Sequence, residues 1–411
     1  MADAQGPTAG NKPQHLTDPR DVVIVDAVRT ASGKGRVGGS LADVHPVDLL
    51  AQTFQRLLER HPAVDPGAVD DVIVGCVSQV GEQSATPGRM AWLGAGFPAH
   101  VPATTIDRKC GSSQQSVHFA AQGIRSGEYD IVVAGGVESM SRVVMGSARM
   151  DADPYGAMVA ERYSPGLVSQ GVAAELVAAR WKLDRASLDE YSVRSHHLAA
   201  AAQESGAFDR EIVPISTPHG VFDRDESIRA GSTVEKLGGL KAVFESPEFS
   251  ERFPDVDWSV TAGNSSQITD GASALLVMSR AKAEELGLTP RARVHSMVVV
   301  GDDPLLMLTG PIPATHQVLE RSGLSLSDID HVEVNEAFAP VPLSWLAEFG
   351  IDPARLNPRG GAIALGHPLG ASGGRLMTTM LHALEDNDQQ FGLQLMCEAG
   401  GMANATIIER L

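Results

Sequence analysis

The stretch VDDVIVGC at residues 69–76 is a short apolar run, rich in β-branched side chains, of the kind that forms a buried strand. The stretch IDHVEVNE at residues 329–336 repeats its length and its pattern. A second pair, DIVVAGGVESMS at residues 130–141 and GLQLMCEAGGMANA at residues 392–405, aligns on its AGG triplets. Because both pairs occur in the same order, the sequence predicts a duplicated fold with a pseudo-twofold axis.

Strand-like and helix-like segments alternate around these repeats. DVVIVDAV at residues 21–28 predicts a strand, and HPVDLLAQTFQRLLER at residues 45–60 carries apolar side chains at helical spacing. TTID at residues 104–107 predicts another strand, followed by a helix over residues 111–126. This alternation favours an α/β fold built on a largely parallel sheet.

Changes in composition along the chain predict its domains. Residues 1–20 are polar, which predicts a mobile tail. The composition of residues 141–258 predicts an inserted, partly loop-built domain. An N-terminal domain then comprises residues 21–140 plus 259–290, and a C-terminal domain comprises residues 291–411. In the inserted segment, Ser187-Leu188-Asp189-Glu190 matches a capping box and predicts one helix after Ser187.

Composition excludes several classes of protein. The chain has 411 residues, enough for two or three domains, and no run of eighteen apolar residues that would span a membrane. The net charge of −18 disfavours binding to nucleic acid or to anionic lipid. The N-terminus has no apolar segment typical of a signal peptide. Three widely spaced cysteines exclude a disulfide framework and suggest a reducing cytoplasm.

Cys110 is the first candidate for chemistry. It lies between a strand that ends near Asp107 and the helix predicted from residue 111. Unpaired N–H groups and the positive end of a helix dipole would lower its pKa from about 8.5 toward neutrality and make it a nucleophile. A small buried apolar residue is the alternative, and this is the interpretation that we keep for Cys76.

His367 is the second candidate, within GGAIALGHPLGASGG at residues 360–374. The six glycines let the backbone approach another group closely and hold His367 in a turn before a helix. A phosphate-binding loop is disfavoured because no lysine follows at P-loop spacing. A hydrogen-bonded structural histidine remains the alternative.

Asn335 and Cys397 lie at the ends of two further predicted strands. An asparagine there can hold a water molecule or donate to an oxyanion, although it can equally cap a helix. A second thiol can carry a proton, although a buried strand cysteine serves packing alone.

Together these segments resemble the thiolase family, over nearly the whole chain from residue 21 to residue 411. The segments that carry the resemblance are VIVDAVRTASGK (23–34), DRKCGSSQQ (107–115), AGGVESMS (134–141), TAGNSSQITDGASA (261–274), NEAFA (335–339), GGAIALGHPLGASG (360–373) and CEAGG (397–401). The sequence DRKCGSSQQ is similar to the corresponding segment of actinobacterial acyl-CoA thiolases.

The resemblance implies an architecture as well as a class of enzyme. It implies the thiolase fold, in which two duplicated βαβαβαββ domains with five-stranded sheets form a five-layered α-β-α-β-α core that carries an inserted loop domain. It further implies a cytoplasmic homodimer or homotetramer without a bound metal. No cofactor is held permanently, and coenzyme A serves as co-substrate.

The resemblance also implies a reaction between two thioesters of coenzyme A. Cys110 attacks the keto carbon of a 3-ketoacyl-CoA after activation by His367, and acetyl-CoA leaves as an enolate that Cys397 protonates. Free CoA then takes the acyl group from Cys110, so the kinetics are ping-pong, and the reverse is a Claisen condensation. His367 and a water molecule held by Asn335 form one oxyanion hole, and the backbone N–H groups of Cys110 and Ala399 form the other.

Further positions match substrate contacts of the family. They are Ser266, Ala262, Arg229 and Phe244 for coenzyme A, Met307 and Phe338 for the acyl group, and Ala337 and Gln170 beside them. Ala399 stands where the family usually has glycine, and Gln170 replaces a methionine common in short-chain members. Arg229, Lys236 and Lys241 would offset the acidic total around the anionic CoA.

Two other functions compete with a thiolase. A decarboxylating ketoacyl synthase shares the fold and the nucleophile, but usually has a second histidine or an asparagine where this chain has Cys397. A non-catalytic acyl-CoA or lipid-binding protein on the same scaffold would lack one of the four catalytic residues, and all four are present. Alkylation of Cys110 at neutral pH would separate such a binding protein from an enzyme with a depressed thiol pKa.

Overall fold

The computed structural model describes residues 18–411, so the expected N-terminal tail lies outside the described residues except for its last three positions. Its main element is an 11-stranded sheet. Nine of its strands follow one another in the order β4 (Ala103–Ile106), β3 (Asp71–Gly75), β5 (Ile131–Ser139), β9 (Thr269–Ser279), β1 (Val22–Thr30), β10 (Ala292–Gly301), β13 (Met402–Arg410), β12 (Phe391–Glu398) and β11 (His331–Val334). The other two are β2 (Gly33–Lys34), which pairs with β9, and β6 (Ile212–Val213), which pairs with β1.

The sheet is mixed, and the expectation of a largely parallel sheet is therefore wrong. β3 pairs in parallel with β4 and β5, but β9 runs antiparallel to β1 and β5, and β13 runs antiparallel to β10 and β12. The reason is clearest at the turn of residues 399–401, where positive φ angles at Gly400 and Gly401 let β12 turn directly into β13. A tight turn of this kind can only join antiparallel strands.

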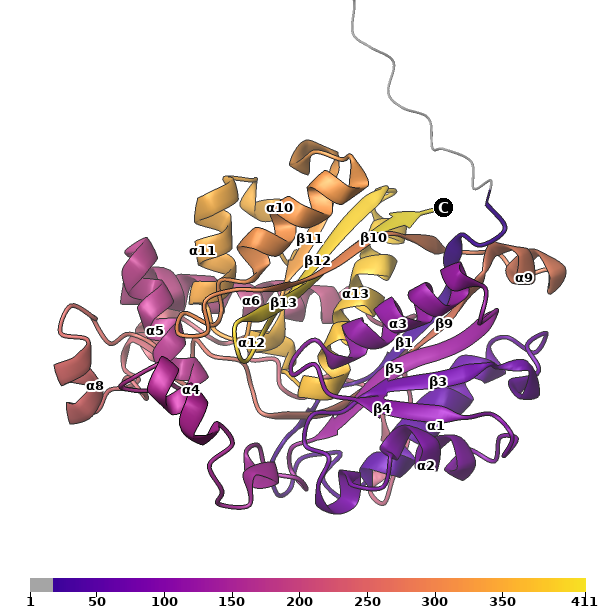
Figure 1. The fold of residues 1–411 in the computed structure, drawn as a ribbon, viewed down its shortest axis with the longest axis horizontal. Helices are drawn as coiled ribbons and strands as arrows, with labels where there is room; N and C mark the ends of the chain where they lie inside the picture. The colour runs from indigo at the N-terminus through magenta and orange to yellow at the C-terminus, as the bar shows by residue number, and fades with distance from the viewer. Residues whose placement is uncertain (1–17) are drawn as a thin grey trace, which may run out of the picture.

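Helices enclose the two halves of the sheet in five layers (Figure 1). α1 (Pro46–Glu59) and α2 (Pro87–Gly94) cover the outer face of the N-terminal half, and α10 (Pro311–Ser322) and α11 (Pro340–Phe349) cover that of the C-terminal half. α3 (Ser112–Ser126) and α13 (Ser372–Asp386) pack against each other between the halves. The halves join through β1 and β10, where Val23 pairs with Arg293 and Ile24 with Ala292. The order α-β-α-β-α is the one implied by the resemblance.

Both faces of the central strands are buried, which explains their continuous apolar runs. In β5, Val133 and Val137 belong to the core beneath α1 and α2. Val132 and Ala134 point to the opposite face and pack in the core around α3 and α13. Side chains that alternate between two covered faces can all be apolar.

Equivalent hydrogen bonds confirm the duplication. Asp70 Oδ2, just before β3, accepts the backbone N–H groups of residues 130 and 131 at 2.6 and 2.9 Å. Asp330 Oδ2, just before β11, accepts those of residues 390 and 391 at 2.8 and 3.0 Å. The C-terminal half departs from five strands, because the counterpart of β4 is a single parallel bridge between Val332 and Leu356.

The alignment of the two AGG triplets is wrong. Residues 134–136 lie inside β5, whereas residues 399–401 form the turn after β12. The hydrogen bonds to Asp70 and Asp330 show that Ile131 corresponds to Phe391, so that Glu138 corresponds to Glu398. The glycines of the two triplets have different roles. Gly135 and Gly136 let neighbouring backbone approach β5, whereas Gly400 and Gly401 adopt positive φ in the turn.

The expected inserted segment contains more regular structure than a single helix. Besides β6 and a short 3-10 helix at Ser147–Arg149, its elements are α4 (Gly156–Arg162), α5 (Gln170–Trp181), α6 (Arg185–Glu204), β7 (Ile215–Thr217), β8 (Gly220–Phe222), α7 (Val234–Gly238) and α8 (Pro247–Arg252). α5 packs against α11, and α6 packs against α12 (Ala362–Leu365), so these two helices lie on the C-terminal half (Figure 1). β6 and β7 of the same segment instead contact β1 and α1 of the N-terminal half. The remaining helix, α9 (Arg280–Glu285), links β9 to β10.

The predicted capping box of α6 is also wrong. Asp184 is the N-cap, and its Oδ1 accepts the backbone N–H of Ser187 at 2.8 Å. Ser187 instead lies in the first turn, where its Oγ donates to the Asp184 carbonyl oxygen. Both residues are good N-caps, and the choice between them depends on where the preceding chain leaves α5. No helix among the described residues is long and apolar enough to span a membrane.

Candidate active site

Cys110 occupies the turn between β4 and α3, as predicted from the sequence. It directly precedes Gly111, the N-cap of α3, and only 4% of its surface is exposed. Its side chain packs with Met140, Leu369 and other buried apolar residues. The thiol thus lies at a helix N-terminus but in an apolar environment.

The glycine-rich loop carries His367 to this place. Gly366 has φ of +86°, and a Cβ there would lie 2.1 Å from Oγ1 of Thr269. A Cβ at Gly370 would lie 2.7 Å from Cα of Cys76 and 2.6 Å from the carbonyl oxygen of Val137. These glycines therefore let the His367 loop pack closely against residues of the N-terminal half.

Hydrogen bonds define which nitrogen of His367 can accept a proton. Nδ1 lies 2.6 Å from Oγ of Ser372, and this hydroxyl donates its own hydrogen to the carbonyl oxygen of Pro368. Nδ1 must then be the donor, which leaves the lone pair on Nε2. Nε2 lies 3.4 Å from Nδ2 of Asn335. His367 is therefore arranged to act as a base through Nε2.

Asn335 links His367 to the second cysteine. It directly follows β11, and its backbone N–H donates to the carbonyl oxygen of Leu395. Its side chain hydrogen-bonds the thiol of Cys397, which lies in β12 and is 1% exposed. Oδ1 of Asn335 is buried and has no partner within residues 18–411. The amide is therefore free to bind a further group through that oxygen.

The pKa of Cys110 contradicts the expectation of a depressed value. Burial, assisted by the nearby carboxyl group of Glu398, raises it to about 12. The backbone N–H groups of Cys110 and Ala399 and the charge of Lys109 act in the opposite direction but are outweighed. The helix N-terminus is present, but desolvation in an apolar site dominates.

The other two titratable groups are also neutral near pH 7. Burial, assisted by the charge of Arg375, lowers the pKa of His367 to about 3. Burial raises the pKa of Cys397 well above its ordinary value, with further contributions from Cys110 and Glu398. The substrate-free site therefore holds two thiols and a neutral imidazole.

The backbone N–H groups expected to form an oxyanion hole act on the nucleophile. Those of Cys110 and Ala399 both act to lower the pKa of the Cys110 thiol. Positive φ in this turn falls on Gly400 and Gly401 and not on Ala399, among the residues that the structure describes. Alanine is therefore compatible with the backbone that presents this N–H group.

A cavity of about 160 Å³ leads to His367. Its walls contain six residues predicted from the sequence: Gln170, Phe244, Ser266, Ala337, Phe338 and His367. The rings of Phe244 and Phe338 meet edge to face at 6.0 Å. Met140 and Leu369 also line it and contact Cys110, so they connect the cavity to the nucleophile.

Three predicted contacts do not line this cavity. Arg229 is exposed, and its Nη2 donates to Oε1 of Gln267, which does line it. Ala262 is exposed. Met307 is buried in the apolar core of the C-terminal half.

Several residues of the site were not predicted. Ser372 orients His367, and Met140, Met145, Gln267, Ile268 and Leu369 line the cavity. Ser372 follows His367 by five positions, but a serine at a helix start is usually a cap. The apolar residues come from distant segments, and no local pattern marks them.

Comparison with known proteins defines the class of this site. A family model described as thiolase, N-terminal domain, matches residues 22–281, and one described as thiolase, C-terminal domain, matches residues 288–410. The chain belongs to the thiolase family.

Individual relatives cover almost the entire chain. Steroid 3-ketoacyl-CoA thiolase FadA6 of Mycobacterium tuberculosis is 48% identical over 95% of this chain and 94% of its own length. A 3-ketoacyl-CoA thiolase of Aeromonas salmonicida is 44% identical over 95% of this chain and 100% of its own. The crystal structure of the Bacillus anthracis acetyl-CoA acetyltransferase superposes with a TM-score of 0.84 at 38% identity, covering 95% of this chain and 99% of that one.

Proposed function

We propose that this chain cleaves 3-ketoacyl-CoA with free CoA, giving acetyl-CoA and a shortened acyl-CoA, and that Cys110 carries the acyl group. One observation carries the proposal: two buried thiols, a correctly oriented imidazole and two backbone N–H groups converge at one place. The relatives named 3-ketoacyl-CoA thiolase support the substrate class. The ketoacyl synthase alternative is disfavoured by Cys397.

In the first half-reaction, Nε2 of His367 takes the proton of Cys110, and the thiolate attacks the keto carbon of the substrate. The bond between C2 and C3 then breaks, and its electron pair forms the enolate of acetyl-CoA. Cys397 donates its proton to C2, which leaves an acyl-Cys110 thioester and a Cys397 thiolate. Donors positioned before the reaction stabilise the oxyanions, in the two holes expected from the sequence.

In the second half-reaction, the Cys397 thiolate takes the proton of free CoA. The CoA thiolate attacks the acyl carbon, and Cys110 leaves as a thiolate that recovers its proton from His367. Every group returns to its starting state, and the reverse sequence is a Claisen condensation. Because burial raises the pKa of Cys110 to about 12, the group is a thiol at neutral pH until His367 takes its proton as the bond to the substrate forms.

The two ends of the substrate meet different surroundings. We place the acyl end and the pantetheine arm along the cavity that contains Phe244 and Phe338. Arg229, Lys236 and Lys241 are exposed and lie outside it, where they would meet the phosphates. This local positive charge reconciles a net charge of −18 with an anionic ligand.

The assembly proposed is a cytoplasmic homodimer or homotetramer. Large apolar side chains are exposed along the segment before and within α4: Val144, Met145, Met150, Tyr155 and Met158. Contiguous exposed apolar surface favours contact with another chain. Sedimentation of the wild type and of Met158→Glu would show whether this segment contributes.

The nucleophile can be tested directly. Cys110→Ala should lose thiolysis by at least about 10⁴-fold, and should take up no acyl group from a 3-ketoacyl-CoA, as judged by intact-protein mass. Cys76→Ala is the matched control, because Cys76 is a buried thiol outside the site and should keep both properties. Near-normal thiolysis by Cys110→Ala would refute the proposal.

The substrate range needs a separate measurement. Rates of CoA-dependent cleavage should be compared over 3-ketoacyl-CoAs of increasing chain length and one with fused rings. The relative FadA6 is named a steroid thiolase, and this motivates the ring-bearing member. No cleavage of any member would contradict the proposed substrate class.

A further inference from the structure

Glu398 is a buried acidic residue that the mechanism above does not use. It is the last residue of β12 and directly follows Cys397. Its side chain has 0% exposure, and neither carboxyl oxygen has a hydrogen-bonding partner within residues 18–411. A buried carboxyl group without partners costs stability and therefore requires an explanation.

The carboxyl group lies directly against the nucleophile turn. A Cβ at Gly111 would lie 1.8 Å from Oε1 of Glu398, so any side chain at that position would displace it. Gly111 is the N-cap of α3 and follows Cys110. The charge of Glu398 raises the pKa of both Cys110 and Cys397, which places it within reach of both thiols.

Glu138, at the equivalent position of the N-terminal half, provides an internal comparison. Its carboxyl group accepts the backbone N–H groups of Val77, Ser78 and Gly370 at 2.9, 3.0 and 2.9 Å, and the side chain of Gln83 at 3.0 Å. Burial raises the pKa of both glutamates, but these bonds counteract it at Glu138 alone. Glu138 is thus bound into the structure, and Glu398 is not.

We propose that Glu398 is a positioning residue for Cys110, whose buried carboxyl group controls by its charge how readily the neighbouring thiol loses its proton. This inference rests on the proposed role of Cys110 as acyl carrier. Burial raises the pKa of Glu398 to about 8, with Arg108 acting against the rise and Asp107 adding to it. Lys109 is the other charged group that acts on Cys110.

The effect follows from the order in which the groups ionise. Below about pH 8 the carboxyl group is neutral and does not oppose a thiolate beside it. As the pH rises further, Glu398 ionises before Cys110 and places a like charge next to it. The thiol is then harder to ionise than burial alone would make it.

Glu398→Gln keeps the shape of the side chain and removes its charge. We expect the rate of Cys110 alkylation by iodoacetamide, followed against pH by peptide mass, to move toward lower pH by about one unit. Several-fold faster alkylation should result in mildly alkaline buffer. Glu398→Asp, which restores the charge, should move the profile back toward that of the wild type.

Glu138→Gln is the matched control. It should lower the midpoint of thermal unfolding because its hydrogen bonds are lost, and leave the alkylation profile in place. A folded Glu398→Gln variant with the wild-type profile would overturn the proposal. An equal displacement by Glu138→Gln would also overturn it, because the effect would then be structural.

A measurement on the unaltered protein covers the case in which Glu398→Gln does not fold. Infrared difference spectra should contain a protonated carboxyl band that disappears as the pH is raised through about 8, and the rate of Cys110 alkylation should rise less steeply with pH across that midpoint. An alkylation profile without a change of slope at the midpoint of the carboxyl band would refute the coupling. Alkylation does not depend on turnover, so the roles of Glu398 and of Cys110 in thiolysis can fail separately.

Discussion

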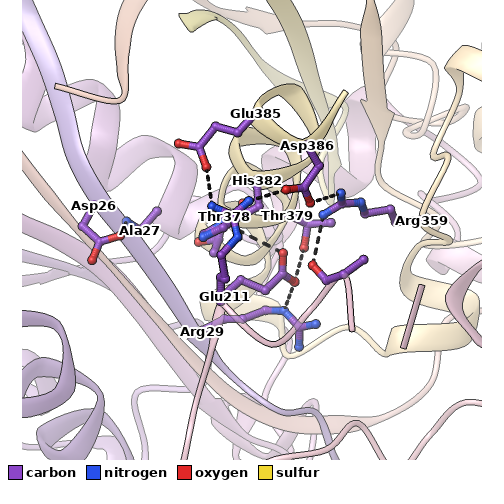
Figure 2. Close-up of polar contacts among 12 residues, drawn as sticks. Asp26, Ala27, Arg29, Glu211, Arg359, Thr378, Thr379, His382, Glu385 and Asp386 are labelled. Carbon is purple, nitrogen blue, oxygen red and sulfur yellow. Dashed lines mark hydrogen bonds and ion pairs between the residues drawn. The ribbon is translucent and has the colours of Figure 1, made fainter. Parts of the chain in front are cut away.

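Two groups of buried polar side chains differ in how their charges are compensated. Arg29 is fully buried, and its guanidinium group donates to Glu211 at 2.6 Å and to Asp225 at 2.8 and 2.9 Å. Thr379 adds a bond to the same oxygen of Glu211 (Figure 2). Although burial disfavours the charge, the two carboxylates raise the pKa of Arg29 above its ordinary value. We refer to these four residues as the Arg29 cluster.

The Arg29 cluster connects separate parts of the chain. Arg29 belongs to β1, Glu211 and Asp225 to the segment after α6, and Thr379 to α13. Further ion pairs continue along α13, among them that of Arg359 with Asp386 (Figure 2). This cluster holds the N-terminal half, the C-terminal half and the intervening segment together.

The polar groups of the active site are equally buried, but they lack the partners that the Arg29 cluster has. Oδ1 of Asn335 and both carboxyl oxygens of Glu398 have no partner among the described residues, and Cys110 and Cys397 are held as thiols. In the Arg29 cluster each carboxylate is bonded to Arg29 and only Oε2 of Glu211 lacks a hydrogen bond, whereas neither oxygen of Glu398 has one among the described residues. Buried charges held by partners serve the structure, and buried polar groups without partners are available for chemistry. This comparison predicts that substitutions in the two places separate stability from activity.

The largest difference between the loss of activity and the loss of stability is expected for Cys397→Ala. Thiolysis should fall by about 10²–10⁴-fold because no thiol remains to protonate the enolate. Transfer of an acetyl group from acetyl-CoA to Cys110 should be slowed less, because the CoA thiolate can leave without a proton from Cys397, and the acetylated protein should still form in an intact-mass assay. Loss of acetylation together with a lowered midpoint of thermal unfolding would assign Cys397 a structural role.

Arg29→Met, in the Arg29 cluster, should instead lower the stability of the protein. Two buried carboxylates would lose their partner, and the free energy of unfolding in urea should fall by about 3–5 kcal/mol. Arg56→Met is the control, because the ion pair of Arg56 with Glu59 is exposed and should contribute less than about 1 kcal/mol. Similar losses of unfolding free energy in both variants would contradict the expected difference between the buried cluster and the exposed ion pair.

Ser372→Ala should affect orientation at the active site. Without the Oγ acceptor, Nδ1 of His367 no longer holds its proton in place, and kcat should fall by about 10–100-fold with little change in KM. Ser372→Thr retains the hydroxyl group and should recover most of the rate. A rise in KM alone would indicate that the serine serves binding instead.

Acid sensitivity is the smallest expected effect. The unfolded chain protonates His367 near pH 6.5, whereas burial lowers its pKa in the folded state to about 3. Stability is therefore lost as the pH falls from 6.5 toward 3, by about 2 kcal/mol at pH 5. Urea unfolding of His367→Asn should depend less on pH over this range, and identical slopes would contradict the assignment.

Much of the fold and of the site was predictable from local pattern. The strand before Cys110, the helix after it and the strands ending at Asn335 and Cys397 all lie where the sequence predicts them. The two AGG triplets were misaligned because glycine serves two purposes, close packing in β5 and positive φ after β12. The cap of α6 was misplaced because Asp184 and Ser187 are equally suitable.

The sequence alone determined which segments become strands and helices, and which side chains stand at their ends, because hydrophobic period and turn chemistry act between near neighbours. Only the tertiary structure decided how those groups ionise. The thiol pKa of Cys110 depends on burial by distant segments and on Glu398, which reaches Gly111 across the two halves. Desolvation and pairing are sums over the surroundings in space, and no local stretch of sequence contains them.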